Sequence, residues 1–227
     1  TMIVLAFIFG NIFGHDESKV LNYPVYLLCG RLLYEFYSQA TKRAMRSIRN
    51  SASVIKKVYV PKYIYPMANV TSNFITFLIS LLVLVFVMGY YLIFTDTAMR
   101  LTPYIFLSFV PIIILFVLCA GVGMILCTME VFFKDVEYMY EVFCMLLFYA
   151  TPIFYDVETL RITNKYAQYA LMANPLYSIV SMFRDCVLFG RAMNPHHIIY
   201  SAVFSIVMLL IGVLVFYKKQ DDFILHI

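Results

Sequence analysis

Two charged residues lie inside an otherwise apolar stretch, residues 24–40. Arg31 and Glu35 are spaced i,i+4, so on a helix they share one face and can form an ion pair. If this stretch crosses a membrane, each charge costs about 2.5 to 3.5 kcal/mol at its centre. We therefore expect Arg31 to extend towards the membrane boundary and Glu35 to turn towards the helix bundle. The pair is either a structural ion pair near the interface or part of a substrate path.

Other groups that could do chemistry are few. The sequence has no phosphate-binding pattern GxxxxGK[ST], so the chain does not hydrolyse a nucleotide by that route, and any ATP must be used by a partner. His196 and His197 have no Cys, Asp or Glu set at ligand spacing, which predicts no metal site. The five cysteines form no CxxC pair and are expected to pack as small hydrophobic residues. We predict no catalytic residues and no cofactor in this chain.

The composition requires a membrane environment for these residues. Of 227 residues, 63% are hydrophobic and 13% charged, whereas soluble domains have about 45 to 50% apolar and about 25% charged residues. A helical span needs about 20 residues, so this length fits one membrane domain, residues 1–227, and leaves no room for a soluble domain. The net charge of +4 does not suggest nucleic-acid binding.

Six apolar runs predict an all-α fold of six transmembrane helices. They are residues 1–14, 24–40, 68–94, 104–129, 138–155 and 198–217. Three contain stretches of at least 20 residues without a charge, namely 74–94, 104–127 and 198–217, and these define the clearest spans. Because Thr1 already lies inside the first run, we expect a native N-terminal cytoplasmic segment to be missing from this sequence.

The distribution of basic residues predicts the orientation. Between the second and third runs there are seven basic residues and no acidic one from Lys42 to Lys62, which places this loop in the cytoplasm. Counting spans from that loop places Lys218 and Lys219, and with them the C-terminus, on the cytoplasmic side. The chain is thus expected to be a multi-pass protein of a bacterial cytoplasmic membrane.

Two segments on this side could meet a cytoplasmic partner. In the first, Ser53 can cap a short helix with Val54, Ile55 and Val58 on one face and Lys56 and Lys57 on the other. Such a helix either lies on anionic lipid or docks a cytoplasmic subunit. The second is the turn before the fifth run, which contains Lys134, Asp135 and Glu137.

The remaining features lie in the fifth run and after it. The fifth run has more aromatic rings than an interfacial belt requires, so its rings are either core or the lining of a passage suited to sugars. Residues 156–197 are too polar to span and predict two short amphipathic helices at the outer interface, separated at Asn174-Pro175.

Several of these segments together resemble a known family, the type 2 ABC transporter permeases that export bacterial polysaccharides such as O-antigens and teichoic acids. The segments that carry the resemblance are Ile55-Lys56-Lys57-Val58-Tyr59-Val60-Pro61, Phe132-Phe133-Lys134-Asp135-Val136, Thr151-Pro152-Ile153-Phe154-Tyr155, Asn174-Pro175, Phe183-Arg184-Asp185 and Gly190. One departure is Gly30-Arg31-Leu32-Leu33-Tyr34-Glu35, where the family often has Gly-Leu-Leu-Pro-Trp.

The resemblance implies a homodimer joined to two copies of an ABC ATPase, which would bind the ATP and magnesium. The substrate implied is an undecaprenyl-pyrophosphate-linked glycan moved outward through the membrane. The segment from Ser53 to Tyr59 and the turn from Lys134 to Glu137 would transmit ATPase movement. The outer-mouth helices would include Asn174, Pro175, Arg184 and Asp185. The first and fifth spans would line the channel, with candidates Phe7, Asn11, Tyr138, Phe148, Tyr149 and Tyr155.

Two other classes of function remain open from the sequence. The nearer is a type 2 ABC exporter of a drug or lipid, and the farther is a secondary carrier or membrane-bound transferase. A carrier should have buried titratable residues at mid-membrane, and apart from Arg31 and Glu35 the sequence has none there.

Overall fold

The computed structural model describes residues 23–58, 60–94, 103–153, 171 and 173–223, and these contain helices and no strand. The long helices are α2 (Tyr23–Met45), α5 (Ile64–Phe94), α6 (Phe109–Phe132) and α10 (Pro195–Lys219). Shorter elements are α3 (Ser47–Asn50), α4 (Ala52–Ile55), α7 (Val136–Ala150), α9 (Pro175–Val187) and the 3-10 helices η1 (Pro103–Ser108) and η2 (Gln220–Asp222). The all-α class predicted from the sequence is confirmed for this part of the chain.

Three helical segments of the described residues are long and apolar enough to cross a membrane: Ile64–Gly89, Tyr104–Phe132 and Pro195–Asp222. They correspond to the third, fourth and sixth predicted spans. The second predicted span is the helix α2, which carries Arg31 and Glu35. The fifth is α7, whose 15 residues extend about 22 Å, less than the hydrocarbon thickness of about 30 Å. The first predicted span lies outside the described residues.

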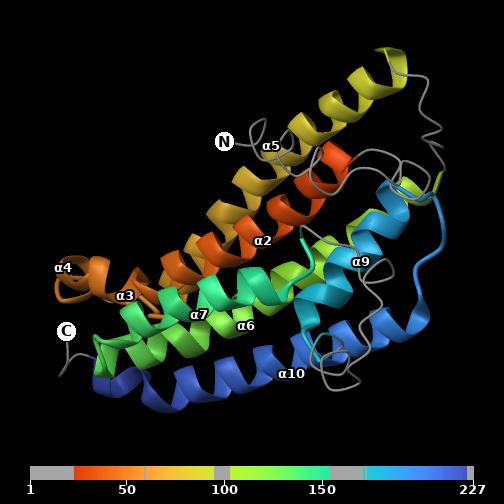
Figure 1. Cartoon of the computed structure of the whole chain (residues 1–227). Helices are drawn as coiled ribbons and strands as arrows, with labels where there is room; N and C mark the ends of the chain where they lie inside the picture. Colours follow the sequence, from red (N-terminus) through yellow and green to blue (C-terminus); the bar gives the residue numbers. More distant parts are fainter. Residues whose placement is uncertain (1–22, 59, 95–102, 154–170, 172, 224–227) are drawn as a thin grey trace.

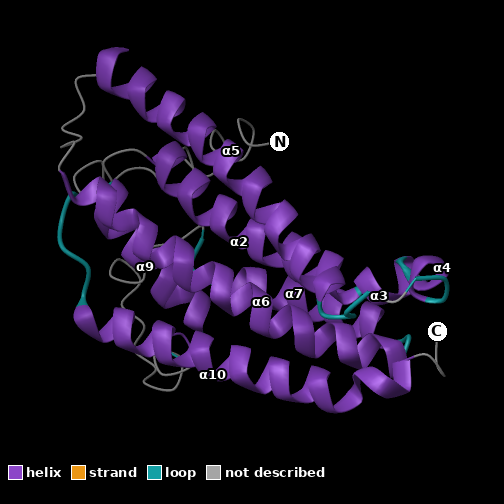
Figure 2. Cartoon of the chain, turned by 180° about the vertical axis from the view of Figure 1, so that it is seen from behind, coloured by secondary structure: helices purple, strands orange, loops and turns teal. Residues whose placement is uncertain are grey.

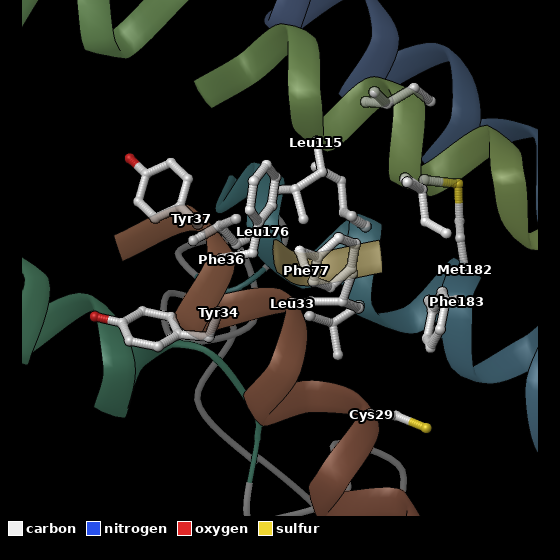
Figure 3. Close-up of a cluster of buried hydrophobic side chains, with 14 of the residues drawn as sticks. Cys29, Leu33, Tyr34, Phe36, Tyr37, Phe77, Leu115, Leu176, Met182 and Phe183 are labelled. Carbon is white, nitrogen blue, oxygen red and sulfur yellow. The ribbon is translucent and has the colours of Figure 1, made fainter. Parts of the chain in front are cut away.

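The bundle is arranged around α6, which contacts α2, α5, α9 and α10. Figure 1 shows α5 and α2 side by side, followed by α6 and α10. The view from behind in Figure 2 shows the same order, with α7 along the lower halves of α2 and α6. Side chains from four helices form the core: Leu33 of α2, Phe77 of α5, Leu115 of α6 and Leu176 of α9 meet within it (Figure 3).

The helices α6 and α10 approach each other through glycines. A Cβ atom added to Gly121 would lie 2.5 Å from the backbone nitrogen of Leu209, and one added to Gly212 would lie 2.5 Å from the carbonyl oxygen of Gly121. No side-chain rotation can relieve such contacts, because the opposing atoms belong to the backbone. Small residues at this crossing therefore set the distance between the two helices.

The helix α9 is where the structure departs most from the sequence-based prediction. We expected it to lie on the outer interface, but ten of its residues are buried, and it packs against α2, α6, α10 and η1. The Asn174 side chain accepts a hydrogen bond from the Leu176 backbone nitrogen at 3.0 Å, and Pro175 occupies the first turn. Asn174-Pro175 thus starts a buried helix, because the apolar residues of α9 are covered by neighbouring helices. The other short helix, which we predicted before Asn174, falls mainly outside the described residues.

Five chain segments meet at one end of the bundle, which we call the basic end. It comprises the end of α2, α3 and α4, the start of α5, the junction of α6 and α7, and the end of α10 (Figure 1). A buried apolar cluster joins α3, α6 and the end of α10, and Ile55 of α4 and Tyr65 of α5 pack against it; its buried members are Ile48, Cys127, Val131, Phe216 and Phe223. Lys62 donates from Nζ to the Gln220 carbonyl oxygen at 2.5 Å. The predicted basic loop and the basic end of the last span therefore lie together.

Candidate functional site

The predicted docking helix after Ser53 is shorter than expected. The structure has a helix of four residues, α4 (Ala52–Ile55), flanked by Ser51, with no side-chain cap. We had predicted that Ser53 caps this helix. Ser53 instead lies inside α4. Val54 and Val58 are 48% and 54% exposed, whereas Ile55 packs against the apolar cluster of the basic end. The expected common face thus divides into an anchor, Ile55, and two exposed valines, with Lys56 and Lys57 exposed beside them.

The turn between α6 and α7 also divides into two parts. Lys134 and Asp135 are exposed and are available to a partner. Glu137 points instead towards α2 and α3: its Oε1 lies 2.7 Å from Arg46 Nη2, and its Oε2 lies 2.9 Å from Arg49 Nη2. Its carboxylate is therefore engaged within the chain.

Glu137 belongs to an arginine–glutamate network that also includes Arg46, Arg49, Glu130 and Glu141. Arg46 Nη2 lies 3.0 Å from Glu141 Oε1, and Arg49 Nη1 lies 2.7 Å from Glu130 Oε1. The side chain of Glu130 is fully buried, while the two arginines are about one third to two fifths exposed. Each arginine has a permanently charged, planar guanidinium group with several N–H donors, so one side chain can bridge more than one carboxylate.

This network connects the two segments that the sequence singled out as docking surfaces. Arg46 directly precedes α3, and Arg49 lies within α3, just before α4. Glu130 and Glu137 lie on either side of the turn that contains Lys134 and Asp135. A displacement of α4 is thus resisted by ion pairs to the ends of α6 and α7. The sequence reasoning missed the network, although the signal was present: a wholly basic loop and an acidic connection were both placed on the cytoplasmic side.

Replacing Glu137 with glutamine should loosen this end of the bundle. The change removes two of the four close arginine–carboxylate contacts, and Arg49 then retains only buried Glu130. Because the pairs are partly exposed, we expect a loss of about 1 kcal/mol. Glu141→Gln is the matched control, since Glu141 is 47% exposed and, among the described residues, forms an ion pair with Arg46 only.

Thermal unfolding of the two purified variants and the native chain measures how much stability each substitution removes. Glu137→Gln should lower the unfolding midpoint by about 2 to 4 °C and Glu141→Gln by less. Equal midpoints for both variants and the native chain would show that the network contributes nothing to stability.

Arg184 forms a second site, distant from the basic end. It is 4% exposed and donates from Nη1 to the Pro152 carbonyl oxygen at 2.7 Å and from Nη2 to that of Ile153 at 2.9 Å. Nη2 also lies 3.2 Å from the Tyr26 carbonyl oxygen, and the guanidinium lies 3.5 Å from the Tyr26 ring centroid. Arg184 thus ties the residues after α7 to α2 and α9. The sequence had placed it on an interfacial helix, and its partner carbonyls could not be inferred from residue types.

The other residues of this region have structural partners. Asp185 accepts from Arg191 Nε at 2.7 Å, and Asn174 donates from Nδ2 to Thr151 Oγ1 at 3.1 Å. Gly190 has a φ of 56°, a conformation that favours glycine. Asn174 and Arg184 therefore contact the residues that follow α7, whereas Asp185 pairs with Arg191 beyond α9.

Arg31 and Glu35 form the predicted pair at a long distance. Arg31 Nε lies 3.9 Å from Glu35 Oε2, and the side chains are 31% and 49% exposed. The pairing is confirmed. We had expected Glu35 to turn towards the helix bundle, but its side chain is half exposed and does not enter the core of the chain. It lines an open groove between α2 and α5 with a volume of about 220 Å³.

The aromatic candidates of the fifth run separate into core and surface. Tyr138 and Tyr149 are 71% and 61% exposed, so core packing does not account for them within one chain. Phe148 packs against Tyr34 with ring centroids 4.9 Å apart. Tyr140 is buried and donates to Thr41 Oγ1 at 2.8 Å. Phe7, Asn11, Tyr59 and Tyr155 lie outside the described residues.

No group of three His, Cys, Asp or Glu side chains that could hold a metal ion occurs among the residues that the structure describes. All five cysteines are free and buried, which confirms that they pack as apolar residues.

Known proteins are similar to this sequence over most of its length. The ABC-2 type transporter family matches residues 1–188. The chain is 27% identical to an O-antigen export system permease protein, RfbA, of Klebsiella pneumoniae, over 90% of this chain and 76% of that protein. It is 23% identical to RfbA of Myxococcus xanthus, over 91% and 77% of the two chains. It is also 23% identical to the polysialic acid transport protein KpsM of Escherichia coli, over 97% and 82%. The family match covers more than half of the chain, which therefore belongs to the ABC-2 type transporters.

Proposed function

We propose that this chain is the permease subunit of an ABC exporter that moves a polysaccharide, carried on a lipid, outward across a bacterial cytoplasmic membrane. The observation that carries the proposal is the similarity to polysaccharide export permeases over nine tenths of the chain. The proposed topology has six spans with the basic end in the cytoplasm. It is supported by the common position of the basic loop, Lys218 and Lys219 at one end of the bundle (Figure 1).

In this proposal two copies of the chain form the permease and two copies of an ATPase bind ATP and magnesium. A second copy is favoured by the exposed face of α7, where Tyr138, Val142, Met145 and Tyr149 are all more than 60% exposed. An apolar helix face of this length is normally covered by lipid or protein. Tyr138 and Tyr149 would then stand between the two copies, where tyrosine rings and hydroxyls suit passing sugars.

Coupling to the ATPase would use the exposed valines of the basic end. Val54 and Val58 offer apolar contacts, Lys56 and Lys57 offer charge, and Lys134 and Asp135 form a second surface nearby. Movement of α4 would pass through Arg46 and Arg49 to α6 and α7, because the network joins these elements by short ion pairs.

The docking role is tested by replacing Val54 and Val58 together with aspartate. Both side chains are about half exposed, so the double variant should still fold and insert, while two charges in an apolar contact should prevent ATPase binding. We expect the native chain to copurify with an ATPase. The double variant should retain at most about one tenth of that copurified ATPase. Val54→Thr with Val58→Thr is the control for shape, and it should keep most of the binding.

The same strains test the transported substrate. Cells with the native chain should display a surface polysaccharide that cells with the aspartate variant lack. A variant that retains both ATPase and polysaccharide would contradict the docking role. Loss of drug resistance or of a simple lipid at the surface, with polysaccharide unchanged, would indicate the other type of ABC exporter.

A further inference from the structure

Arg184 joins three chain segments away from the basic end. It belongs to α9, which lies towards the opposite end of the bundle (Figure 1). Its guanidinium lies 3.5 Å from the ring centroid of Tyr26 on α2 and donates to the carbonyl oxygens of Pro152 and Ile153, which follow α7. Arg184 is therefore shared by α2, α9 and the segment that ends α7.

The carbonyls that Arg184 binds lie at membrane depth. The helix α7 starts at Val136, shortly after a candidate span that ends at Phe132. Its length of about 22 Å is less than the hydrocarbon thickness of about 30 Å. Non-helical backbone is tolerated at this depth where it is buried in protein, and Thr151 and Ile153 are 1% and 0% exposed. The end of α7 therefore needs partners within the protein, and its helix dipole favours a positive one.

Gly30 leaves the space that the guanidinium occupies. A Cβ atom added at this position would lie 2.5 Å from Arg184 Nη2 and 3.4 Å from Ile153 Cγ2. Gly30 follows Tyr26 by one turn of α2, so the two residues lie on the same helix face. Glycine in a helix costs about 0.5 to 1 kcal/mol relative to alanine, and the approach of Arg184 accounts for it here. We call Tyr26 and Gly30 the α2 cradle.

Polar contacts attach α7 to its neighbours at its start and in its middle as well. At the start, Arg46 Nη2, directly after α2, lies 2.7 Å from Glu137 Oε1. Further along, the Tyr140 hydroxyl donates to Thr41 Oγ1 of α2 at 2.8 Å. With Arg184 beyond its end, α7 is held at both ends. Because a packed helix of this length is a stiff element, a displacement of its start is carried to its end.

We propose that Arg184, held in the α2 cradle, is a positioning residue for export, through which a movement of α7 reaches α9. The inference rests on the proposed export function and adds to it the residue that links the two helices. The guanidinium receives the displacement through the carbonyls that follow α7. Asn174, at the start of α9, follows the same segment because its Nδ2 donates to Thr151 Oγ1 at 3.1 Å.

Gly30→Ala tests this role without removing the positive charge. The new Cβ atom meets the tip of a flexible side chain, so the guanidinium can move aside while the helices keep their places. We expect the amount of permease–ATPase complex and its basal ATP hydrolysis to stay near the native values. In membrane vesicles from cells that synthesise the polysaccharide, export per ATP hydrolysed should fall by at least about fivefold. Gly89→Ala is the matched control, because its Cβ atom meets nothing within 4 Å.

The ratio of export to hydrolysis separates a positioning role from a structural one. A chain that is only destabilised yields less complex, and its export and hydrolysis fall together. Either that parallel loss or a native ratio in Gly30→Ala would overturn the proposal.

A double variant tests whether Gly30 and Arg184 act as one unit. Alanine at position 30 should add no further loss of export to Arg184→Met, because the guanidinium that it obstructs is gone. Losses that simply add would show that the two residues act independently, and would contradict the cradle.

Tyr26 provides a second pair of variants should Gly30→Ala yield no complex. Tyr26→Leu removes the ring that lies against the guanidinium and should lower the same ratio, whereas Tyr26→Phe keeps the ring and should keep the native ratio. Equal ratios for the two variants would overturn the proposal. If the native chain itself exports no polysaccharide, the proposed function fails, which is a separate result.

Discussion

Alanine at position 121 is expected to push α6 away from α10 and to prevent the bundle from packing. The new Cβ atom would lie 2.5 Å from the Leu209 backbone nitrogen and 2.6 Å from the Met208 carbonyl carbon, far inside normal contact. Overpacking costs about 1 to 3 kcal/mol where side chains can adjust. Here only a shift of a whole helix relieves the contact, so we expect the upper part of that range or more.

A glycine on α5 offers a control with the opposite sign. A Cβ atom at Gly89 meets nothing within 4 Å, and alanine in a helix is favoured over glycine by about 0.5 to 1 kcal/mol. Gly121→Ala should therefore lower the unfolding midpoint and the yield of monodisperse protein, while Gly89→Ala should leave both unchanged or raise them. A midpoint for Gly121→Ala at or above that of the native chain would show that α6 and α10 do not pack through these glycines.

Replacement of Arg184 by methionine should have the second large effect. Methionine keeps apolar contact in the site but leaves the carbonyl oxygens of Pro152 and Ile153 without their guanidinium donor. A buried acceptor left without a partner costs about 1 to 3 kcal/mol, and two such groups should outweigh the relief from burying a charge. We expect the chain to lose stability and the residues after α7 to lose their fixed position beside α2.

The lysine variant separates geometry from charge. Arg184 serves different carbonyls with Nη1 and Nη2, and a single ammonium group cannot reproduce this fork. Arg184→Lys should therefore fail to restore the midpoint or polysaccharide export. Arg43→Met is the control, because Arg43 is exposed at the end of α2. Full rescue by Arg184→Lys would mean that only the positive charge matters. A native unfolding midpoint for Arg184→Met would show that Arg184 does not stabilise the fold.

The positions of the long helices could be predicted from the sequence alone. Residues 74–94, 104–127 and 198–217 carry no charge, and hydrocarbon admits such a segment only as a helix with its backbone hydrogen bonds satisfied internally. The ends were also readable, because Lys42, Arg43, Lys218 and Lys219 mark the last turns of α2 and α10. These features depend on the local segment and its solvent, so no tertiary information was needed.

Side-chain environment on the short elements was decided by tertiary packing. Val54, Ile55 and Val58 are chemically alike, yet Ile55 meets the cluster around Phe216 and Phe223 while the valines stay exposed. The helix α9 has the composition of an interfacial helix, but α6, α10 and α2 enclose it. Local periodicity states which residues share a face, and only the neighbouring helices determine what that face contacts.

The candidate sites show the same division. The sequence identified Arg31, Glu35, Glu137 and Arg184 as residues of interest. It could not show that Glu137 binds Arg46 and Arg49, that Arg184 holds the Pro152 and Ile153 carbonyls, or that Glu35 faces Asn73 and Thr76 across a groove. Each of these contacts joins residues far apart in the chain, and their geometry is fixed by how closely the helices approach, as at Gly121 and Gly212. Residue types therefore determined which groups could interact in this protein, and the packing distances between helices determined which of them do.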